Sequence, residues 1–280
     1  MKIEKTKEIG FCFGVKRAVD ILEKVSKERG GVETLGAVVH NQQVLQKLAG
    51  IGVRVAKDIE DIEGKAVAIS SHGVAPELED KIKARKIDIV DTTCPFVHRL
   101  QTAARRLAQA GFLVVIYGDA DHTEVKGVLG WAEGKGVATL DEKDIFKLEP
   151  LPRRIGVLSQ TTQIPADFVD FVKKLIDGAF SRDSELRIID TICHDLRKRQ
   201  AQALELADRV DLMLVIGGRG SANTNRLAEL CAAVTETHLV ETAEDINPEW
   251  FKGKENIGVT SGASTAEATI EEVLGRLKKL

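Results

Sequence analysis

The sequence predicts an α/β protein built from three related units, each with a small, mostly parallel β-sheet. Short β-rich runs alternate with helix-like segments along all 280 residues. No long Gly/Ser or Pro linker divides the chain, and one cysteine motif recurs three times with the same downstream spacing. Strand–helix alternation is typical of parallel sheets with right-handed crossovers. A recurring motif indicates copies of one unit rather than a single large sheet.

The expected elements follow one another in a regular order. We expect strands at residues 65–70, 87–91, 112–117, 154–158, 186–190, 211–216, 238–241 and 256–260. Between them, helix-like segments lie at residues 96–110, 167–179, 196–207, 225–234 and 265–279.

Internal repeats define the units. Each unit has a Cys at a strand end, a Gly 24 residues later and a His or Ser 28 residues later: Cys12, Gly36 and His40; Cys94, Gly118 and His122; Cys193, Gly217 and Ser221. A second pattern also recurs in each unit: a strand is followed directly by small polar residues, at 68–73, 157–162 and 259–264. Each unit therefore has three strand-to-helix corners, and ligands of parallel sheets bind at such corners.

The repeats divide the chain into residues 14–96, 97–193 and 194–280. The third unit ends in a helix and lacks a closing strand with a Cys corner, which residues 1–13 can provide. We therefore predict that the first strand joins the sheet of the third unit. The result would be a pseudo-threefold trefoil in which residues 1–13 belong with residues 194–280.

Composition excludes several functional classes. Lys and Arg number 40 against 43 Asp and Glu, a net charge of −3, which gives no support to a nucleic-acid or anionic-membrane surface. No apolar run approaches the roughly 18–20 residues that cross a membrane. The first residues carry charges where a signal peptide would place its apolar stretch. We expect a soluble, cytoplasmic protein.

The cysteines predict a metal centre. Four cysteines are widely spaced and form no C-x-x-C pair. The repeat register would bring Cys12, Cys94 and Cys193 to one point, each before a helix N-terminus that favours a thiolate. Three thiolates suit a [4Fe–4S] cluster whose open iron acts as Lewis acid and electron source; loss of that iron would leave [3Fe–4S]. Cys231 lies in an apolar helical segment and is expected to be a core residue.

A second set of polar residues lies at the same corners. Hydroxyl, imidazole and helix N-terminal N–H groups together favour an anion, phosphate in particular. The candidates are His40, His72, His122, Thr161, Ser221, Asn223 and Ser264. Glu124, two residues after His122, could donate protons in a reductive step. It could equally be an ordinary acidic residue in the first turn of a helix.

At these residues the chain resembles the 4-hydroxy-3-methylbut-2-enyl diphosphate reductases, the last enzymes of the non-mevalonate isoprenoid pathway. The matching motifs span nearly the whole chain: GFCFGV at 10–15, VHN at 39–41, SHGV at 71–74, DTTCP at 91–95, HTEV at 122–125, SQTT at 159–162, DTIC at 190–193, SANTNRL at 221–227 and GAS at 262–264. The chain departs from the usual family pattern at Thr123, Leu196 and Ala222.

The resemblance implies a trefoil around one [4Fe–4S] cluster held by Cys12, Cys94 and Cys193. It implies an allylic diphosphate substrate whose 4-hydroxyl binds the open iron. The diphosphate would lie among His40, His72, His122, Ser221, Asn223 and Ser264. Glu124, Thr161 and His122 would form the catalytic group. Two electrons from ferredoxin or flavodoxin and two protons would remove the hydroxyl as water, giving isopentenyl and dimethylallyl diphosphate.

Two other functions use the same residues. One is a three-lobed binding protein that captures a phosphorylated small molecule and leaves its cysteines buried. The other is a hydrolytic enzyme with a zinc site of Cys and His. Neither needs three thiols at one repeat register, and bound iron with acid-labile sulfide would distinguish them from an iron–sulfur reductase.

Overall fold

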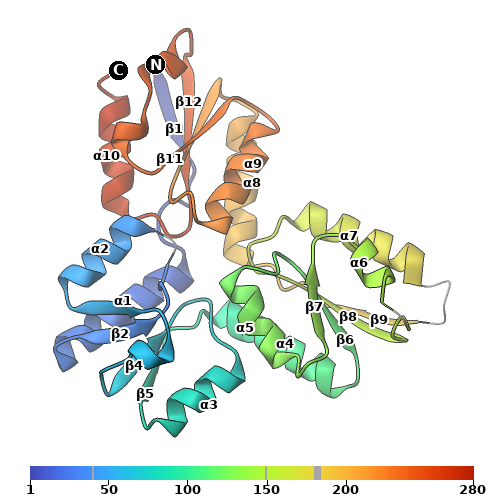
Figure 1. Ribbon diagram of the computed structural model, residues 1–280. Helices are drawn as coiled ribbons and strands as arrows, with labels where there is room; N and C mark the ends of the chain where they lie inside the picture. The colour runs from blue at the N-terminus through green and yellow to red at the C-terminus, as the bar shows by residue number, and fades with distance from the viewer. Residues whose placement is uncertain (40, 149, 180–183) are drawn as a thin grey trace.

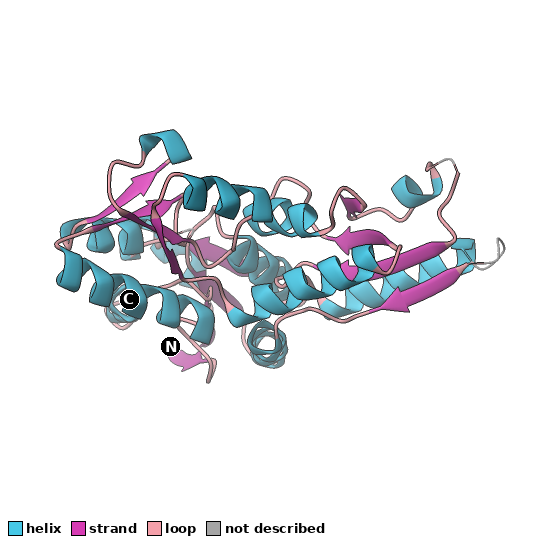
Figure 2. Ribbon diagram, turned by 90° about the horizontal axis from the view of Figure 1, so that it is seen from below, coloured by secondary structure: helices cyan, strands magenta, loops and turns pink. Residues whose placement is uncertain are grey.

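A computed structural model describes residues 1–39, 41–148, 150–179 and 184–280. In this part of the chain, three four-stranded sheets form three lobes around a common centre (Figure 1). Among the described residues, neighbouring strands of each sheet pair in parallel. Seen from below, the molecule is thinner than it is wide (Figure 2). The predicted α/β class, with three small parallel sheets, is therefore confirmed.

The three lobes repeat one order of elements. The first contains α1 (Phe13–Arg29), β2 (Val32–Leu35), α2 (Gln42–Gly50), β3 (Val53–Ala56), η1 (Ile59–Asp61), β4 (Ala66–Ile69), α3 (Pro76–Ala84) and β5 (Asp88–Asp91). The second contains α4 (Pro95–Gln109), β6 (Leu113–Tyr117), α5 (Thr123–Trp131), β7 (Gly136–Thr139), α6 (Lys143–Phe146), β8 (Arg154–Ser159), α7 (Pro165–Ala179) and β9 (Glu185–Ile188). The third contains α8 (His194–Ala207), β10 (Leu212–Ile216), α9 (Ala222–Ala232), β11 (Thr237–Val240), η3 (Ala243–Asp245), η4 (Pro248–Phe251), β12 (Asn256–Ser261) and α10 (Glu267–Leu277). The sheet orders β3-β2-β4-β5, β7-β6-β8-β9 and β11-β10-β12-β1 match position by position.

The N-terminal strand β1 (Lys2–Lys5) completes the third sheet, as predicted. It pairs in parallel with β12, with Lys2 opposite Asn256 and Lys5 opposite Val259. In this position β1 is the counterpart of β5 and β9, the strands that precede the other two Cys corners. The unit boundaries at residues 14, 97 and 194 remain a prediction.

Each sheet is covered on both faces, so its strands carry apolar side chains in succession. In the second lobe, Leu100, Ala104 and Leu107 follow the helical spacing of α4 and pack with Leu158 of β8 on one face. On the other face, Val157 packs against α7. Corresponding pairs of apolar clusters lie in the first and third lobes. No helix of the described residues is long and apolar enough to span a bilayer.

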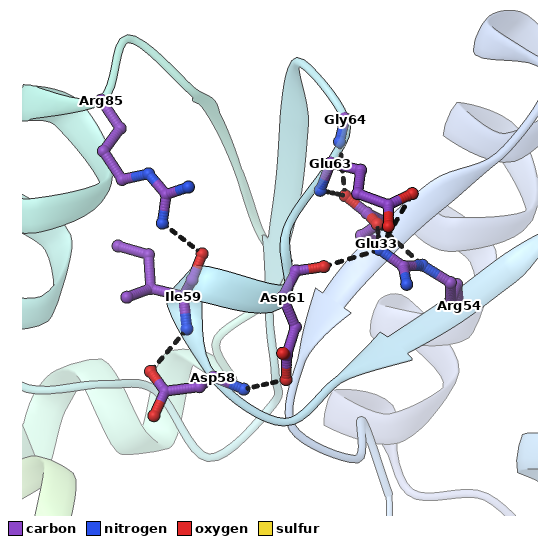
Figure 3. A network of polar contacts seen from close by, with 8 residues as sticks. All are labelled: Glu33, Arg54, Asp58, Ile59, Asp61, Glu63, Gly64 and Arg85. Atoms are coloured by element: carbon purple, nitrogen blue, oxygen red, sulfur yellow. Dashed lines mark hydrogen bonds and ion pairs between the residues drawn. The ribbon is translucent and has the colours of Figure 1, made fainter.

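A buried carboxylate stabilises the outer part of the first lobe (Figure 3). Glu33 of β2 accepts hydrogen bonds from the backbone N–H groups of Glu63 and Gly64 at 3.0 and 2.7 Å. The Arg54 guanidinium binds the same carboxylate, with Nε 2.8 Å from Oε1. Arg54 also donates to the carbonyl of Asp61 at 2.7 Å. The network joins β2, β3 and the segment after η1, so a charged residue is accommodated within a strand.

Most expected elements are present, with small shifts at their ends. Strands β2, β3 and β7 were not predicted; each has only four residues, and buried Glu33 and Thr34 interrupt the apolar pattern of β2. Helix α9 begins three residues earlier than expected because Ser221 caps it. Helix α10 begins two residues later, after a turn in which the N–H of Thr265 donates to the carbonyl of Gly262 at 3.2 Å.

Helix α5 of the second lobe packs closely on the first lobe. The indole N–H of Trp131 donates to the carbonyl of Val74 at 2.9 Å. A Cβ placed on Gly130 would lie 2.4 Å from the Cβ of Ala75, a distance that real Cβ atoms do not reach. Gly130 therefore permits the close approach of the two lobes.

Replacing Gly130 tests this contact. By helix propensity alone, Gly130→Ala should stabilise the protein by up to about 1 kcal/mol. Because the added methyl would meet Ala75, we expect Gly130→Ala to destabilise it by roughly 1–3 kcal/mol in urea unfolding. Gly275→Ala in α10 is the matched control, since nothing lies within 4 Å of its added methyl, and this variant should be stabilised. Equal effects of the two substitutions would contradict the close contact.

Candidate active site

The three cysteines of the repeat meet at the centre of the molecule. Cys12, Cys94 and Cys193 are the N-cap residues of α1, α4 and α8, and all three line one cavity. The cavity encloses about 700 Å³, its open mouth included. Cys231, by contrast, is fully buried in an apolar cluster beneath α9, as predicted.

Each Cys corner is hydrogen-bonded to the polar corner of the neighbouring strand. The N–H groups of Cys94, Cys193 and Cys12 donate to the carbonyls of Ser71, Thr161 and Ala263 at 3.0, 3.0 and 2.9 Å. These bonds make the next residues, His72, Thr162 and Ser264, structural equivalents, and all three line the cavity. Aligning the corners by sequence had placed Ser71 opposite Gln160, one residue out of register. Thr162 was missed as a site residue for that reason.

The electrostatic environment of the thiols has two opposing parts. Burial raises the pKa of all three, that of Cys193 to about 12. Hydrogen bonds from helix N-terminal N–H groups, led by those of Val15, Phe96 and Leu196, act in the opposite direction. The N of Val15 lies 3.4 Å from Cys12 Sγ. The thiols are therefore protonated at neutral pH in the free chain, and a metal centre would displace their protons.

A basic side chain holds the segment that precedes each of the three thiols. Five residues after each Cys, a Lys or Arg reaches the segment that precedes the next Cys. Arg17 donates to the carbonyl of Thr93 at 3.1 Å, Arg99 donates to the carbonyl of Asp190 at 3.2 Å, and Lys198 forms an ion pair with Glu8. Each contact therefore ties the first helix of a lobe to the segment after that lobe's last strand, just before the Cys that begins the next lobe.

Arg199 adds a buried positive charge that sequence analysis did not identify. Its side chain is 4% exposed, and it donates to the carbonyls of Gly10 and Phe11 at 2.8 and 3.2 Å. Within the described part of the chain, no ion pair joins it to a carboxylate. Its charge lowers the pKa of Cys12 against the effect of burial. A buried guanidinium without a carboxylate is costly unless another negative charge lies near, and thiolates supply one.

The predicted polar residues gather at the same cavity. His72, His122, Thr161, Ser221, Asn223 and Ser264 all line it. The rings of His72 and His122 meet edge to face, with centroids 5.6 Å apart. Ser221 caps α9, its Oγ accepting from the N–H of Thr224 at 3.4 Å. His40 lies outside the described residues.

Two of these polar groups are buried without a protein partner. Asn223 Nδ2 and Ser264 Oγ make no hydrogen bond to any described residue, although both side chains are less than 10% exposed. Buried polar groups in native proteins nearly always have a partner. Asn223 lies in the first turn of α9, where backbone N–H groups also favour an anion. Both groups therefore suit an anionic ligand.

Glu124 is buried and directly bound to Thr161. Its side chain is 2% exposed; Oε1 accepts from the N–H of Thr161 at 2.7 Å and Oε2 from its hydroxyl at 2.6 Å. Burial raises the pKa of Glu124 above its usual value, although both hydrogen bonds from Thr161 oppose the shift. A carboxyl group that holds its proton more firmly than usual suits a proton donor. The burial of Glu124 distinguishes it from an ordinary exposed acidic residue in the first turn of a helix.

His122 is oriented by the helix that follows it. Its Nδ1 accepts a hydrogen bond from the N–H of Glu124 at 3.1 Å, so it serves as the N-cap of α5. In the neutral ring this places the proton on Nε2. His122 can therefore offer an N–H donor within the cavity.

The described residues contain no group of three His, Cys, Asp or Glu side chains that converges on a single metal ion. The zinc site considered from sequence thus has no ready-made ligand set among them. A cluster binds each thiolate through a different iron, so its ligands stand farther apart than those of one ion. Three thiols around a shared cavity, with Arg199 beside them, fit a cluster.

Known proteins resemble this chain over its whole length. A family model described as LytB protein matches residues 3–278. A protein of Dehalococcoides mccartyi strain CBDB1, named 4-hydroxy-3-methylbut-2-enyl diphosphate reductase, is 61% identical over 280 residues, which cover 100% of this chain and 99% of that protein. A protein of the same name from Geotalea uraniireducens is 43% identical, with 100% and 98% coverage.

Two solved structures share the fold. One is described as (E)-4-hydroxy-3-methyl-but-2-enyl diphosphate reductase, the terminal enzyme of the non-mevalonate pathway; it is 35% identical, with a TM-score of 0.73 and coverage of 100% and 99%. The other, from Plasmodium falciparum, is described as the E-1-hydroxy-2-methyl-but-2-enyl-4-diphosphate reductase. It is 25% identical, with a TM-score of 0.92 and coverage of 99% and 88%.

The Thr161 hydroxyl can be tested as a partner of Glu124. Its hydrogen bond favours the charged carboxylate, so Thr161→Val should raise the pKa of Glu124 further. Carbon-13 NMR of the labelled Glu124 carboxyl group would follow the titration. Thr162→Val, one residue away, is the control and should leave that pKa unchanged, because Thr162 makes no hydrogen bond to Glu124. An unchanged or lowered pKa in Thr161→Val would contradict the assigned bond.

Proposed function

The chain belongs to the LytB family, and on this basis we propose that it is a reductase of 4-hydroxy-3-methylbut-2-enyl diphosphate. The reaction uses two electrons and two protons, releases the 4-hydroxyl group as water, and yields isopentenyl and dimethylallyl diphosphate. The observation that carries the proposal is the meeting of three thiols with the buried Glu124–Thr161 pair at one cavity. Full-length relatives with this enzyme name support the same substrate.

Cys12, Cys94 and Cys193 would hold a [4Fe–4S] cluster with one iron free of protein ligands. When bound, the cluster would supply a Lewis-acidic iron for the substrate hydroxyl and the electrons for its removal. The helix N–H groups and Arg199 would offset its negative charge. Leu196 packs with Cys193 and Ala263, which makes the wall beside the thiols apolar and excludes water.

The diphosphate would bind at the corners that lack thiols. Ser221 and Asn223 begin α9, and His122 begins α5, so two helix N-termini would offer N–H groups and positive partial charge. His72 contributes a donor from the first lobe, and Ser264 contributes one from a second corner of the third lobe. We assign the same role to His40, whose position outside the described residues makes this assignment rest on sequence.

Glu124 would supply the protons. Its Oε2 lies 2.6 Å from the Thr161 hydroxyl, which can accept a proton from the protonated acid while it turns its own proton toward the cavity. Thr161 would thereby connect Glu124 to the departing hydroxyl group. The electrons would come one at a time from ferredoxin or flavodoxin.

Anaerobic purification tests the cluster and the activity together. The protein should absorb broadly near ~400 nm, contain about four iron and four sulfide per chain, and reduce the substrate with a chemical reductant. Cys193→Ser should lose most of this iron, because an alkoxide is a poor cluster ligand. Cys231→Ser is the matched control and should retain it. A colourless wild-type protein that cannot be reconstituted would overturn the proposal in favour of a non-redox binding protein.

Replacing the buried acid separates proton supply from cluster binding. Glu124→Gln keeps the shape of the side chain but cannot donate an acidic proton. We expect the iron content and absorbance to stay the same while turnover falls by about 100-fold or more, the usual contribution of a general acid. Near-normal turnover in this variant would remove Glu124 from the proton-donating role.

A further inference from the structure

The first turns of the three Cys helices have two distinct sides. Because a helix turns about 100° per residue, positions one, four and five after the N-cap share a face, and positions two and three lie opposite. The cavity is lined by positions two or three: Gly14 and Val15, Phe96 and Val97, and Leu196. No residue at positions one, four or five lines it. Those positions therefore point away from the substrate cavity.

We define the nine residues at positions one, four and five as the outer face. They are Phe13, Lys16, Arg17, Pro95, His98, Arg99, His194, Arg197 and Lys198. Five are Lys or Arg, two are His and none is acidic, although the whole chain has a net charge of −3. Seven are exposed and two half-buried, and Phe13 is 58% exposed. Positive charge thus surrounds an exposed aromatic ring beside Cys12.

The outer face is continuous across the lobes. Arg17, Arg99 and Lys198 each reach the segment that precedes the next Cys helix, and the N–H of Phe13 lies 3.4 Å from Asp195 Oδ2 of the third lobe. Carboxylates do occur at its margin: Asp91 binds His98, Asp190 binds Arg197 and Glu8 binds Lys198. Within the described residues, Lys16, Arg17 and Arg99 form no ion pair with a carboxylate. Their charges remain available to a partner.

We propose that the outer face docks an acidic one-electron carrier protein. The proposal rests on the proposed function, because only a reductase needs such a partner. Each of the three cysteines immediately precedes a residue of the outer face in the sequence. A redox centre carried by the partner would therefore come close to the cluster site. Each encounter would oxidise the carrier by one electron, and two encounters would supply the two electrons of one turnover.

The composition of the face also suits a brief encounter. A basic surface attracts an acidic protein rapidly and releases it readily at physiological salt, as repeated electron delivery requires. Substrate and carrier would occupy opposite sides of the thiols and would not compete.

Titration calorimetry with an acidic plant-type ferredoxin tests the proposal on the intact, cluster-loaded protein. Binding should weaken steeply between about 0.05 and 0.2 M salt. Lys16→Glu should raise the Kd roughly tenfold. Lys27→Glu is the matched control, since it makes the same charge change on an exposed residue eleven positions along the same helix, about 16 Å away. Its Kd should equal that of the wild type.

Turnover measurements with two reductants distinguish the possible failures. In Lys16→Glu, turnover driven by ferredoxin should fall while turnover driven by reduced methyl viologen stays normal. Equal Kd values for both variants, or binding that is insensitive to salt, would overturn the docking site. A shift between monomer and dimer in Lys16→Glu without a change in Kd would assign the face to self-association instead. Absence of viologen-driven turnover in the wild type would count against the proposed function, and the titration would still decide whether ferredoxin binds here.

Discussion

The site depends on the hydrogen bond between each Cys N–H and the carbonyl of a neighbouring corner. β5 lies beside β4, β9 beside β8 and β1 beside β12, so every thiol is next to a polar corner of the same sheet. Carboxyl ends of parallel strands share one edge of a sheet. Three such edges facing one axis place three thiols and three polar corners around one cavity. A register shift in any sheet would move a thiol and a ligand-binding residue together.

The charges at the centre are balanced by elements from every lobe. Burial alone would hold the thiols protonated, and helix N–H groups and Arg199 act against it. The same burial acts usefully on Glu124, where it favours the protonated acid. Burial in one centre therefore raises the pKa of a carboxyl group, while nearby N–H dipoles and a buried cation favour the thiolate form of the cysteines.

The sequence predicted those features that repeat with a fixed spacing. The other two units each end in a strand that leads to a Cys corner, and the third unit lacks such a strand. Residues 1–13 were assigned to that position for this reason. Strand β2 was missed because a buried Glu33 needs Arg54 and the 63–64 backbone as partners, and these contacts lie far along the chain. The buried position of Arg199 was missed for a similar reason. In the sequence of α8, Arg199 looks like an ordinary basic residue of an amphipathic helix. Such roles depend on partners from distant parts of the sequence, which local patterns do not contain.

Strand β1 also sets the timing of assembly during protein synthesis. Lys2 leaves the ribosome 254 residues before its partner Asn256. At about 5–20 residues per second, roughly 12–50 s separate the two strands. Until then the Cys12 corner has no Ala263 carbonyl to bind, and the first thiol remains on an unanchored segment. The nascent chain can form its two earlier lobes during translation, whereas the Cys12 corner is completed only after Ala263 has emerged.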